Sequence, residues 1–323
     1  MKAVATVFIG ILSAGILSMG TAFSAEPYPV RPIRMVVGFA PGGGTDLTAR
    51  PVAQKLSELL GQQVIVDNRP GAAGNIATEQ VAKAAPDGYT LLMGTIAALA
   101  INPSLYGNLR FDPETDLAPV IQVVDATNVL AVHPSVPASS VKELIALARE
   151  KSLSAGSSGI GATGHLSIEL FNLMAGVKLV HVPYKGGGPA MADLVGGQVN
   201  LIFATTASAI PHLKSGRIKG IAVTTAKRSA LLPDLPTISE SGLAGFDANN
   251  WYGLVVPAKT PRAIIEQLNA EVTKILNMPD VKTTLFNQGL DPAPGTPEQF
   301  GAYIRSERAK WAKVIKASGA KAE

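Results

Sequence analysis

The chain of 323 residues contains no cysteine and few aromatic residues, which make up 5% of it. Without cysteine the protein has no disulfides, no thiolate zinc site, no cysteine nucleophile and no lipid-carrying N-terminal cysteine. The scarcity of aromatic side chains predicts a core that is mainly aliphatic. A chain of this length buries a large core, and length alone suggests two domains.

The sequence also lacks any block of charge of one sign. Its formal net charge of +4 is spread along the chain, with no basic run interleaved with aromatics. Nucleic-acid binding needs a concentrated set of phosphate contacts, so we expect none. The slight positive charge is compatible with a small anion as the ligand.

Long apolar runs are missing except at the N-terminus. Met1-Lys2 is followed by apolar residues through Met19 and then by small residues, which is the layout of a secretory signal peptide. We expect residues 1–25 to be a leader that is cleaved after Ala22, Ser24 or Ala25. No later stretch is apolar for about 18 residues without charge or proline, so we expect no membrane span.

The segment 38–46, here called the first glycine turn, reads Gly-Phe-Ala-Pro-Gly-Gly-Gly-Thr-Asp and follows an apolar run over 33–37. Glycines after a strand and then Thr45 or Asp46, both good helix N-caps, predict a strand-to-helix turn. The free amides of such a turn bind anions. A plain tight connection fits the same residues equally well.

Predicted strands and helices alternate along the chain, which indicates parallel βαβ units and an α/β fold. The first series is strand 33–37, helix 47–60, strand 64–66, helix 76–84, strand 90–94, an irregular stretch 95–119 and strand 120–124. The second is strand 129–132, helix 141–151, strand 153–157, helix 165–175, strand 179–182, helix 189–195, strand 199–203, helix 208–215 and strand 218–224. Strand 251–256 and helices 262–276, 281–287 and 298–316 follow.

Helix ends carry their own signals. Gly61 is a predicted C-cap, and Pro51 predicts an irregular start to the helix that it interrupts. Thr260 and Thr296 each precede a proline and are predicted N-caps. Ser140 and Glu143 predict a capping box.

The two series predict two Rossmann-like lobes. We expect lobe 1 to comprise 26–124 and 249–323, with lobe 2, residues 125–248, inserted into it. The chain then crosses near 120–126 and returns near 246–251, and two crossings make a hinge with the ligand between the lobes.

Gly159–Gly164 matches G-x-G-x-x-G. The dinucleotide fingerprint also needs an acidic residue about 20 positions on, and the segment 179–184 has none, so we expect no nicotinamide or flavin cofactor. The surrounding segment 157–165, the second glycine turn, provides instead another anion-ready helix start, with hydroxyls on Ser157, Ser158 and Thr163.

A third glycine turn, residues 183–189, reads Pro-Tyr-Lys-Gly-Gly-Gly-Pro. Tyr184 either caps the core or faces a ligand, and Lys185 is either a solvated charge or a functional one.

Catalytic constellations are missing: the sequence has no G-x-S-x-G, no H-E-x-x-H, no P-loop lysine and no close acid pair. The four histidines are scattered, and each is better explained as a surface or packed residue than as a metal ligand. His165 is the exception to test, because it lies beside a glycine turn.

Together these turns resemble the tripartite tricarboxylate transporter substrate-binding receptors, or Bug family, of the bacterial periplasm. The matching segments are 39–46, 66–74, 86–90, 157–165, 182–190 and 251–254. The resemblance implies a type II periplasmic binding fold, whose two lobes close over a small organic anion without cofactor or metal. It also implies a monomer that delivers its ligand to membrane subunits of the TctA and TctB type or docks a membrane sensor.

The resemblance further implies a ligand-binding set by motif position. Its members are Phe39, Gly43, Gly44, Thr45, Asp46, Ala97, Ala98, Asn102, Ser158, Gly161, Thr163, His165, Tyr184, Thr205 and Trp251.

One departure concerns the strand 199–203. Many relatives have an acidic residue after it, where this chain has Ala204-Thr205-Thr206. Without that acid the pocket is less suited to an ammonium group, so we expect a simple carboxylate and not an amino acid.

The preferred interpretation is a periplasmic, non-enzymatic receptor. The alternatives are an exported enzyme with His165 as general base and the glycine turns as an oxyanion site, and a ligand-sensing module for a membrane sensor. Recognition through backbone amides leaves the remainder of the ligand unspecified.

Overall fold

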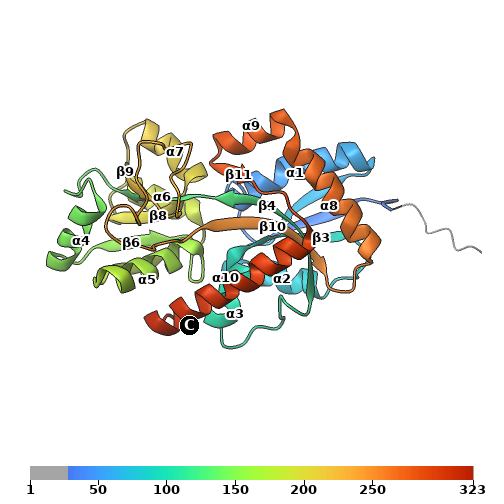
Figure 1. The fold of residues 1–323 in the computed structure, drawn as a ribbon, viewed down its shortest axis with the longest axis horizontal. Helices are drawn as coiled ribbons and strands as arrows, with labels where there is room; N and C mark the ends of the chain where they lie inside the picture. The colour runs from blue at the N-terminus through green and yellow to red at the C-terminus, as the bar shows by residue number, and fades with distance from the viewer. Residues whose placement is uncertain (1–27, 323) are drawn as a thin grey trace, which may run out of the picture.

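The computed structural model describes residues 28–322 and shows two lobes, each built on its own sheet (Figure 1). The expected leader, residues 1–25, lies outside the described residues. None of the helices within residues 28–322 combines the length and the hydropathy of a membrane span.

The first lobe is built on a six-stranded sheet in the order β11-β4-β10-β3-β1-β2. The strands are β1 Ile33–Val37, β2 Val64–Asn68, β3 Thr90–Thr95, β4 Leu117–Ala126, β10 Asn250–Pro257 and β11 Leu290–Pro292. β1 pairs in parallel with β2 and β3, whereas β10 lies antiparallel between β3 and β4.

Helices cover both faces of this sheet (Figure 1). They are α1 Gly44–Leu60, α2 Asn75–Ala82, α3 Asn102–Leu105, α8 Arg262–Asn277, α9 Pro279–Asn287 and α10 Pro297–Ser318, with a short 3₁₀ helix at Ala72–Gly74 and a π-helix at Ala97–Ile101. Strand side chains alternate between the faces. Met35 and Leu91 therefore share a buried cluster with Val52 of α1, whereas Val36 and Leu92 belong to the cluster on the opposite face.

The second lobe is built on a five-stranded sheet in the order β7-β6-β8-β5-β9. The strands are β5 Asn128–Val132, β6 Ser154–Ser157, β7 Val180–Pro183, β8 Leu201–Thr205 and β9 Lys219–Val223, and the helices are α4 Val141–Glu150, α5 Thr163–Ala175, α6 Gly187–Val195 and α7 Thr206–Lys214. β6 is parallel to β7 and β8, and β5 is antiparallel to β8 and β9.

The chain leaves the first sheet after β4 and re-enters it at β10, and these two strands pair along their length. This topology supports the inserted second lobe, and the boundaries at 124/125 and 248/249 stay a prediction.

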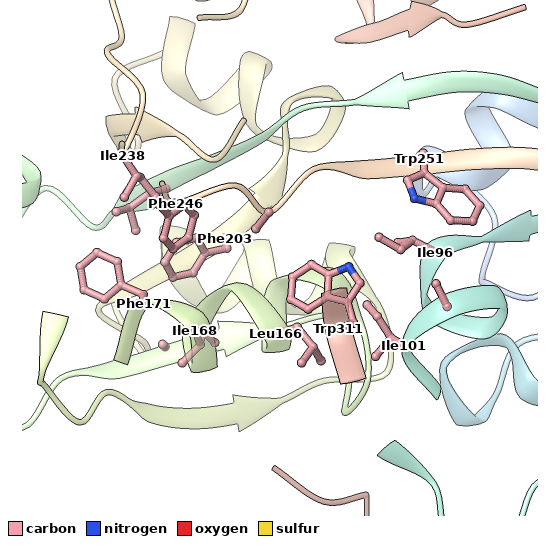
Figure 2. Close-up of a cluster of buried hydrophobic side chains, with 14 of the residues drawn as sticks. Ile96, Ile101, Leu166, Ile168, Phe171, Phe203, Ile238, Phe246, Trp251 and Trp311 are labelled. Carbon is pink, nitrogen blue, oxygen red and sulfur yellow. The ribbon is translucent and has the colours of Figure 1, made fainter. Parts of the chain in front are cut away.

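α10 spans the two lobes along one side of the molecule (Figure 1). Its Trp311 is fully buried and lies between Leu166 of α5 and Ile101 of the π-helix (Figure 2). The indole Nε1 donates to Glu307 Oε2 at 3.1 Å. One hydrophobic cluster is therefore continuous from the first lobe into the second.

The observed start of α1 differs from the predicted one, whereas its observed end agrees with the prediction. α1 begins at Gly44 with Gly43 as N-cap, so the predicted capping by Thr45 or Asp46 is wrong, as is the irregular start at Pro51. Asp46 accepts a hydrogen bond from the preceding Gly42 amide at 2.9 Å, so its side chain fixes the turn and does not cap the helix. The predicted C-cap, Gly61, is confirmed in the left-handed conformation with φ 66°.

Three further caps were predicted. Thr296 forms the full capping box with Gln299. Thr260 does not cap α8, because its hydroxyl donates to the Pro257 carbonyl and Pro261 is the N-cap. At α4 the Ser140 side chain accepts from the Glu143 amide, but the Glu143 carboxylate accepts from Ser139, so half of the predicted box forms.

Candidate functional site

A cavity of about 260 Å³ lies between the two sheets. The first lobe contributes Phe39, Ala40, Pro41, Gly42, Gly43, Gly44, Thr45, Thr95, Ile96, Ala97, Asn250 and Tyr252. The second lobe contributes Asn128, Ser158, Ala162, Thr163, Gly164, Lys185, Gly186, Gly187, Gly188, Pro189, Ile202, Phe203, Ala204, Thr205 and Ser208. All three glycine turns therefore meet at one place.

Four helices begin at this cavity. α1, α5, α6 and α7 start at Gly44, Thr163, Gly187 and Thr206, each next to lining residues. Within the described residues, none of the four N-cap residues accepts a backbone amide of its helix through a side chain. Amides in a first helical turn have no intrahelical partner and lie at the positive end of the helix dipole, so the cavity favours an anion.

The charges of the lining side chains also favour an anion. Among the described residues that line the cavity, Lys185 is the only charged one, and its side chain is exposed. No aspartate or glutamate of the described chain is part of the lining, so nothing there opposes a carboxylate.

Strand β10, by which the chain returns to the first lobe, contributes Asn250 and Tyr252 to the lining of the cavity. The Asn250 amide donates to the Tyr252 hydroxyl at 3.1 Å, and burial raises the pKa of Tyr252 to about 12. The phenol therefore stays neutral and is held against the start of α1.

Eight of the predicted ligand-binding residues line the cavity. They are Phe39, Gly43, Gly44, Thr45, Ala97, Ser158, Thr163 and Thr205. The other members of the predicted set, Asp46, Ala98, Asn102, Gly161, His165, Tyr184 and Trp251, are not part of its lining.

Asp46 lies behind the first glycine turn and is 2% exposed. Its carboxylate accepts from the Gly42 amide, from Asn68 at 3.0 Å and from Arg50 at 2.8 Å. Burial acts to raise the pKa of Asp46, but the hydrogen bonds from Arg50, Gly42 and Asn68 outweigh it and lower the pKa. The residue shapes the turn.

His165 holds the second glycine turn in a similar way. Its Nδ1 accepts from the Gly161 amide at 3.1 Å, and its ring stacks on His181 at 4.1 Å. Burial, with His181 beside it, lowers the pKa of His165 to about 3, and burial lowers that of His181 to about 4. Both rings are neutral, and His165 faces the turn and its neighbours instead of the cavity.

The remaining predicted residues also serve as supports. The Asn102 amide donates to Asn75 at 2.6 Å, and a β-carbon at Gly161 would lie 2.5 Å from the Asn102 oxygen, so these two meet across the lobes. The Tyr184 hydroxyl donates to Asp193 at 2.6 Å. Ala98 is buried in the π-helix.

Trp251 is fully buried in the hydrophobic core (Figure 2). The centre of its ring lies 5.5 Å from that of Phe300 and 5.6 Å from that of Tyr303.

Sequence reasoning missed several lining residues. Thr95, Asn128, Asn250 and Tyr252 lie on strands next to the lobe crossing, and Ser208 lies in the first turn of α7. The glycines of the third turn line the cavity, although only Tyr184 of that turn was predicted as a contact. The proximity of strand ends to the predicted hinge was the available signal for the first group.

A family model described as "Tripartite tricarboxylate transporter family receptor" matches residues 48–320. The chain is 38% identical to Protein BugT of Bordetella pertussis over 99% of this chain and 98% of BugT. Among solved structures, "R. palustris Rpa4515 with adipate" matches with a TM-score of 0.88 and 41% identity, covering 91% of this chain and 99% of that one. MatC from Rhodopseudomonas palustris with bound malate matches with a TM-score of 0.84 and 32% identity, covering 89% and 100% of the two chains.

Proposed function

This chain belongs to the family of tripartite tricarboxylate transporter receptors, and from that membership and the cavity we propose that it captures a small organic carboxylate between its lobes. The observation that carries the proposal is the convergence of four helix starts on a cavity whose described lining includes one lysine and no acid. The relatives solved with adipate and malate make the same ligand class reasonable for this chain.

The proposed contacts are the cavity-lining members of the predicted set. Backbone amides of the first glycine turn and of α5 hold the carboxylate, and the hydroxyls of Thr45, Ser158 and Thr163 complete its hydrogen bonds. Asp46 and His165 do not contact the ligand themselves. Each instead holds a glycine turn in place by accepting one of its backbone amides, and other amides of that turn face the ligand.

The ligand carries no ammonium group. The last two residues of β8, Ala204 and Thr205, line the cavity, and no acid lines it among the described residues. A buried ammonium without a counter-charge is strongly disfavoured. Calorimetric titration with succinate and aspartate tests this point, and tighter binding of aspartate contradicts it.

The chain acts as a receptor without turnover. The alternative, an enzyme, would use His165 as its general base. His165 does not line the cavity, and its Nδ1 already accepts a hydrogen bond from the Gly161 amide. Incubation with the bound acid followed by mass spectrometry should return the acid unchanged, and a product would favour the enzyme.

The remaining proposals concern location and partners. The receptor works in the periplasm after removal of the leader, is a monomer, and delivers its ligand to TctA- and TctB-type membrane subunits. In-cell cross-linking of the full chain, with and without ligand, distinguishes such a transporter from a membrane sensor.

The decisive experiment is identification of the ligand. Mass spectrometry of small molecules released from the purified protein, followed by calorimetric titration with dicarboxylates, tricarboxylates and aromatic acids, should yield a carboxylate that binds at one site. Binding of neutral solutes alone would contradict the proposal.

A further inference from the structure

Two polar side chains that line the cavity have no hydrogen-bond partner within residues 28–322. Asn128, at the start of β5, is 1% exposed, and neither its Oδ1 nor its Nδ2 is paired. Thr95, at the end of β3, is 5% exposed, and its Oγ1 is unpaired. The two belong to different lobes and are here called the strand-end pair.

The carbonyl of Asn128 is already hydrogen-bonded, whereas both polar atoms of its side-chain amide are open. Its strand is paired with β8, and its carbonyl accepts from the Thr224 amide at 3.0 Å. Unpaired polar atoms in a buried position destabilise a fold, and such atoms are found where a ligand or water completes them. Both amide atoms are open, so the conclusion does not depend on which way the amide is turned.

The hydrogen-bonding capacity of the amide limits what completes it. A carboxylate only accepts hydrogen bonds, so it can pair with Nδ2 but never with Oδ1. Oδ1 needs a donor on the ligand. An ammonium donor is disfavoured because no acid lines the described cavity. A hydroxyl both donates and accepts, as Asn128 and Thr95 together require.

We propose that the strand-end pair recognises a hydroxyl group of the ligand, so that this receptor prefers hydroxy acids to the corresponding deoxy acids. The proposal rests on the carboxylate-binding function above and adds the chemistry of the rest of the ligand. The helix starts hold the carboxylate, and the strand-end pair selects on the hydroxyl.

The test is calorimetric titration with acids that differ by one hydroxyl: propionate and lactate, succinate and malate, glutarate and 2-hydroxyglutarate. At least one hydroxy acid should bind about tenfold or more tightly than its partner, because a site that pairs with a hydroxyl rejects the analogue lacking it. Equal affinities within every pair would mean that water completes Asn128 and would overturn the inference alone. Failure of all carboxylates to bind would overturn the proposed function with it.

Variants separate recognition from a structural role. In Asn128→Leu, and in Asn128→Ala, which adds no apolar volume, the preference should fall to within about twofold while the deoxy acid still binds. The ligand-free melting temperature should not fall in Asn128→Leu, because that substitution removes only unpaired polar atoms.

Asn269→Leu is the matched control. The Asn269 amide donates to the Val120 and Gly295 carbonyls, so the variant should lower the melting temperature and keep the preference. A reduced melting temperature with an intact preference in both Asn128 variants would assign Asn128 a structural role.

Discussion

The hydroxyl oxygen of Tyr252 lies 2.6 Å from the position that a β-carbon at Gly44 would occupy. Tyr252 is buried and held by Asn250, so it has little room to move. The glycine that starts α1 is therefore required by a strand that returns to the first lobe about 200 residues later in the chain.

Gly44→Ala should weaken carboxylate binding by about tenfold or more and lower the free energy of unfolding by about 1–3 kcal/mol, since it forces Tyr252 against the helix start. Gly43→Val provides the contrast. A β-carbon there meets only the Ala40 carbonyl, at 3.6 Å, so stability should change by about 0.5 kcal/mol or less while the added bulk enters the cavity and abolishes binding. Calorimetry and urea unfolding measure both effects, and wild-type affinity in both variants would refute the assignment of the first glycine turn.

Gly289→Ala should weaken ligand binding by disturbing a contact between the lobes. The Thr206 hydroxyl of α7 donates to the Gly289 carbonyl at 3.0 Å, and a β-carbon at Gly289 would collide with that hydroxyl. Gly319→Ala is the matched control, because φ is +71° there against +73° at Gly289, but no atom lies within 4 Å. Both variants should lose about 1 kcal/mol of stability to backbone strain. Gly289→Ala should lose more, because its β-carbon also collides with buried Thr206.

Only Gly289→Ala should lose affinity and give a larger radius of gyration in X-ray scattering at saturating ligand. Equal behaviour of the two variants would show that the Thr206 contact does not affect binding.

Stability should fall with acid because of His165 and His181. Both pKa values are lowered in the folded state, to about 3 and about 4, so below about pH 6.5 the unfolded chain binds protons that the folded chain does not. Each ring then removes up to about 1.4 kcal/mol of stability per pH unit, until the pH reaches its folded pKa. The contribution is fully present above about pH 6.5.

Urea unfolding at pH 7.5 and 5.0 measures this loss. The double variant His165→Asn/His181→Asn should show a smaller difference between the two pH values than the wild type, because neither position titrates. Asn at 165 keeps an acceptor for the Gly161 amide. An unchanged difference would mean that groups other than these two histidines dominate the pH dependence.

The two tryptophans should respond differently to replacement by phenylalanine. Trp251 Nε1 has no partner among the described residues, whereas Trp311 Nε1 donates to Glu307. Trp311→Phe should therefore cost about 1–3 kcal/mol more than Trp251→Phe, because it leaves the 5%-exposed Glu307 without that donor. Ligand affinity should be unchanged in Trp251→Phe, since the indole lies in the core, and a tenfold loss would return Trp251 to the ligand-binding set. Urea unfolding and calorimetry provide the two readouts.

Much of the fold follows from local signals. The alternation of apolar strands with helices, the C-cap at Gly61 and the Thr296 capping box each involve residues that are close together in sequence. A short stretch of sequence is therefore enough to predict them. β11 and the π-helix over 97–101 were not predicted, because a three-residue strand exists only through its pairing with β4, and the π-helix lies in a stretch with no periodic pattern.

The features of the site likewise fall into those that short stretches of sequence predict and those that depend on the fold. The glycine-rich turns at several strand ends and the lack of catalytic motifs can be read from the sequence alone. The resemblance adds that Ala204 and Thr205 stand where many relatives have an acidic residue. Each of these is a property of neighbouring residues.

Which side chains line the cavity was set by the tertiary structure. It turned His165 and Asp46 away from the cavity to hold the glycine turns, and it brought Tyr252 against Gly44 and left Asn128 unpaired in the lining. These relationships depend on β10 entering between β3 and β4 and on the lobes facing each other. Such long-range pairing is set by the summed packing of both cores, which no short stretch of sequence contains.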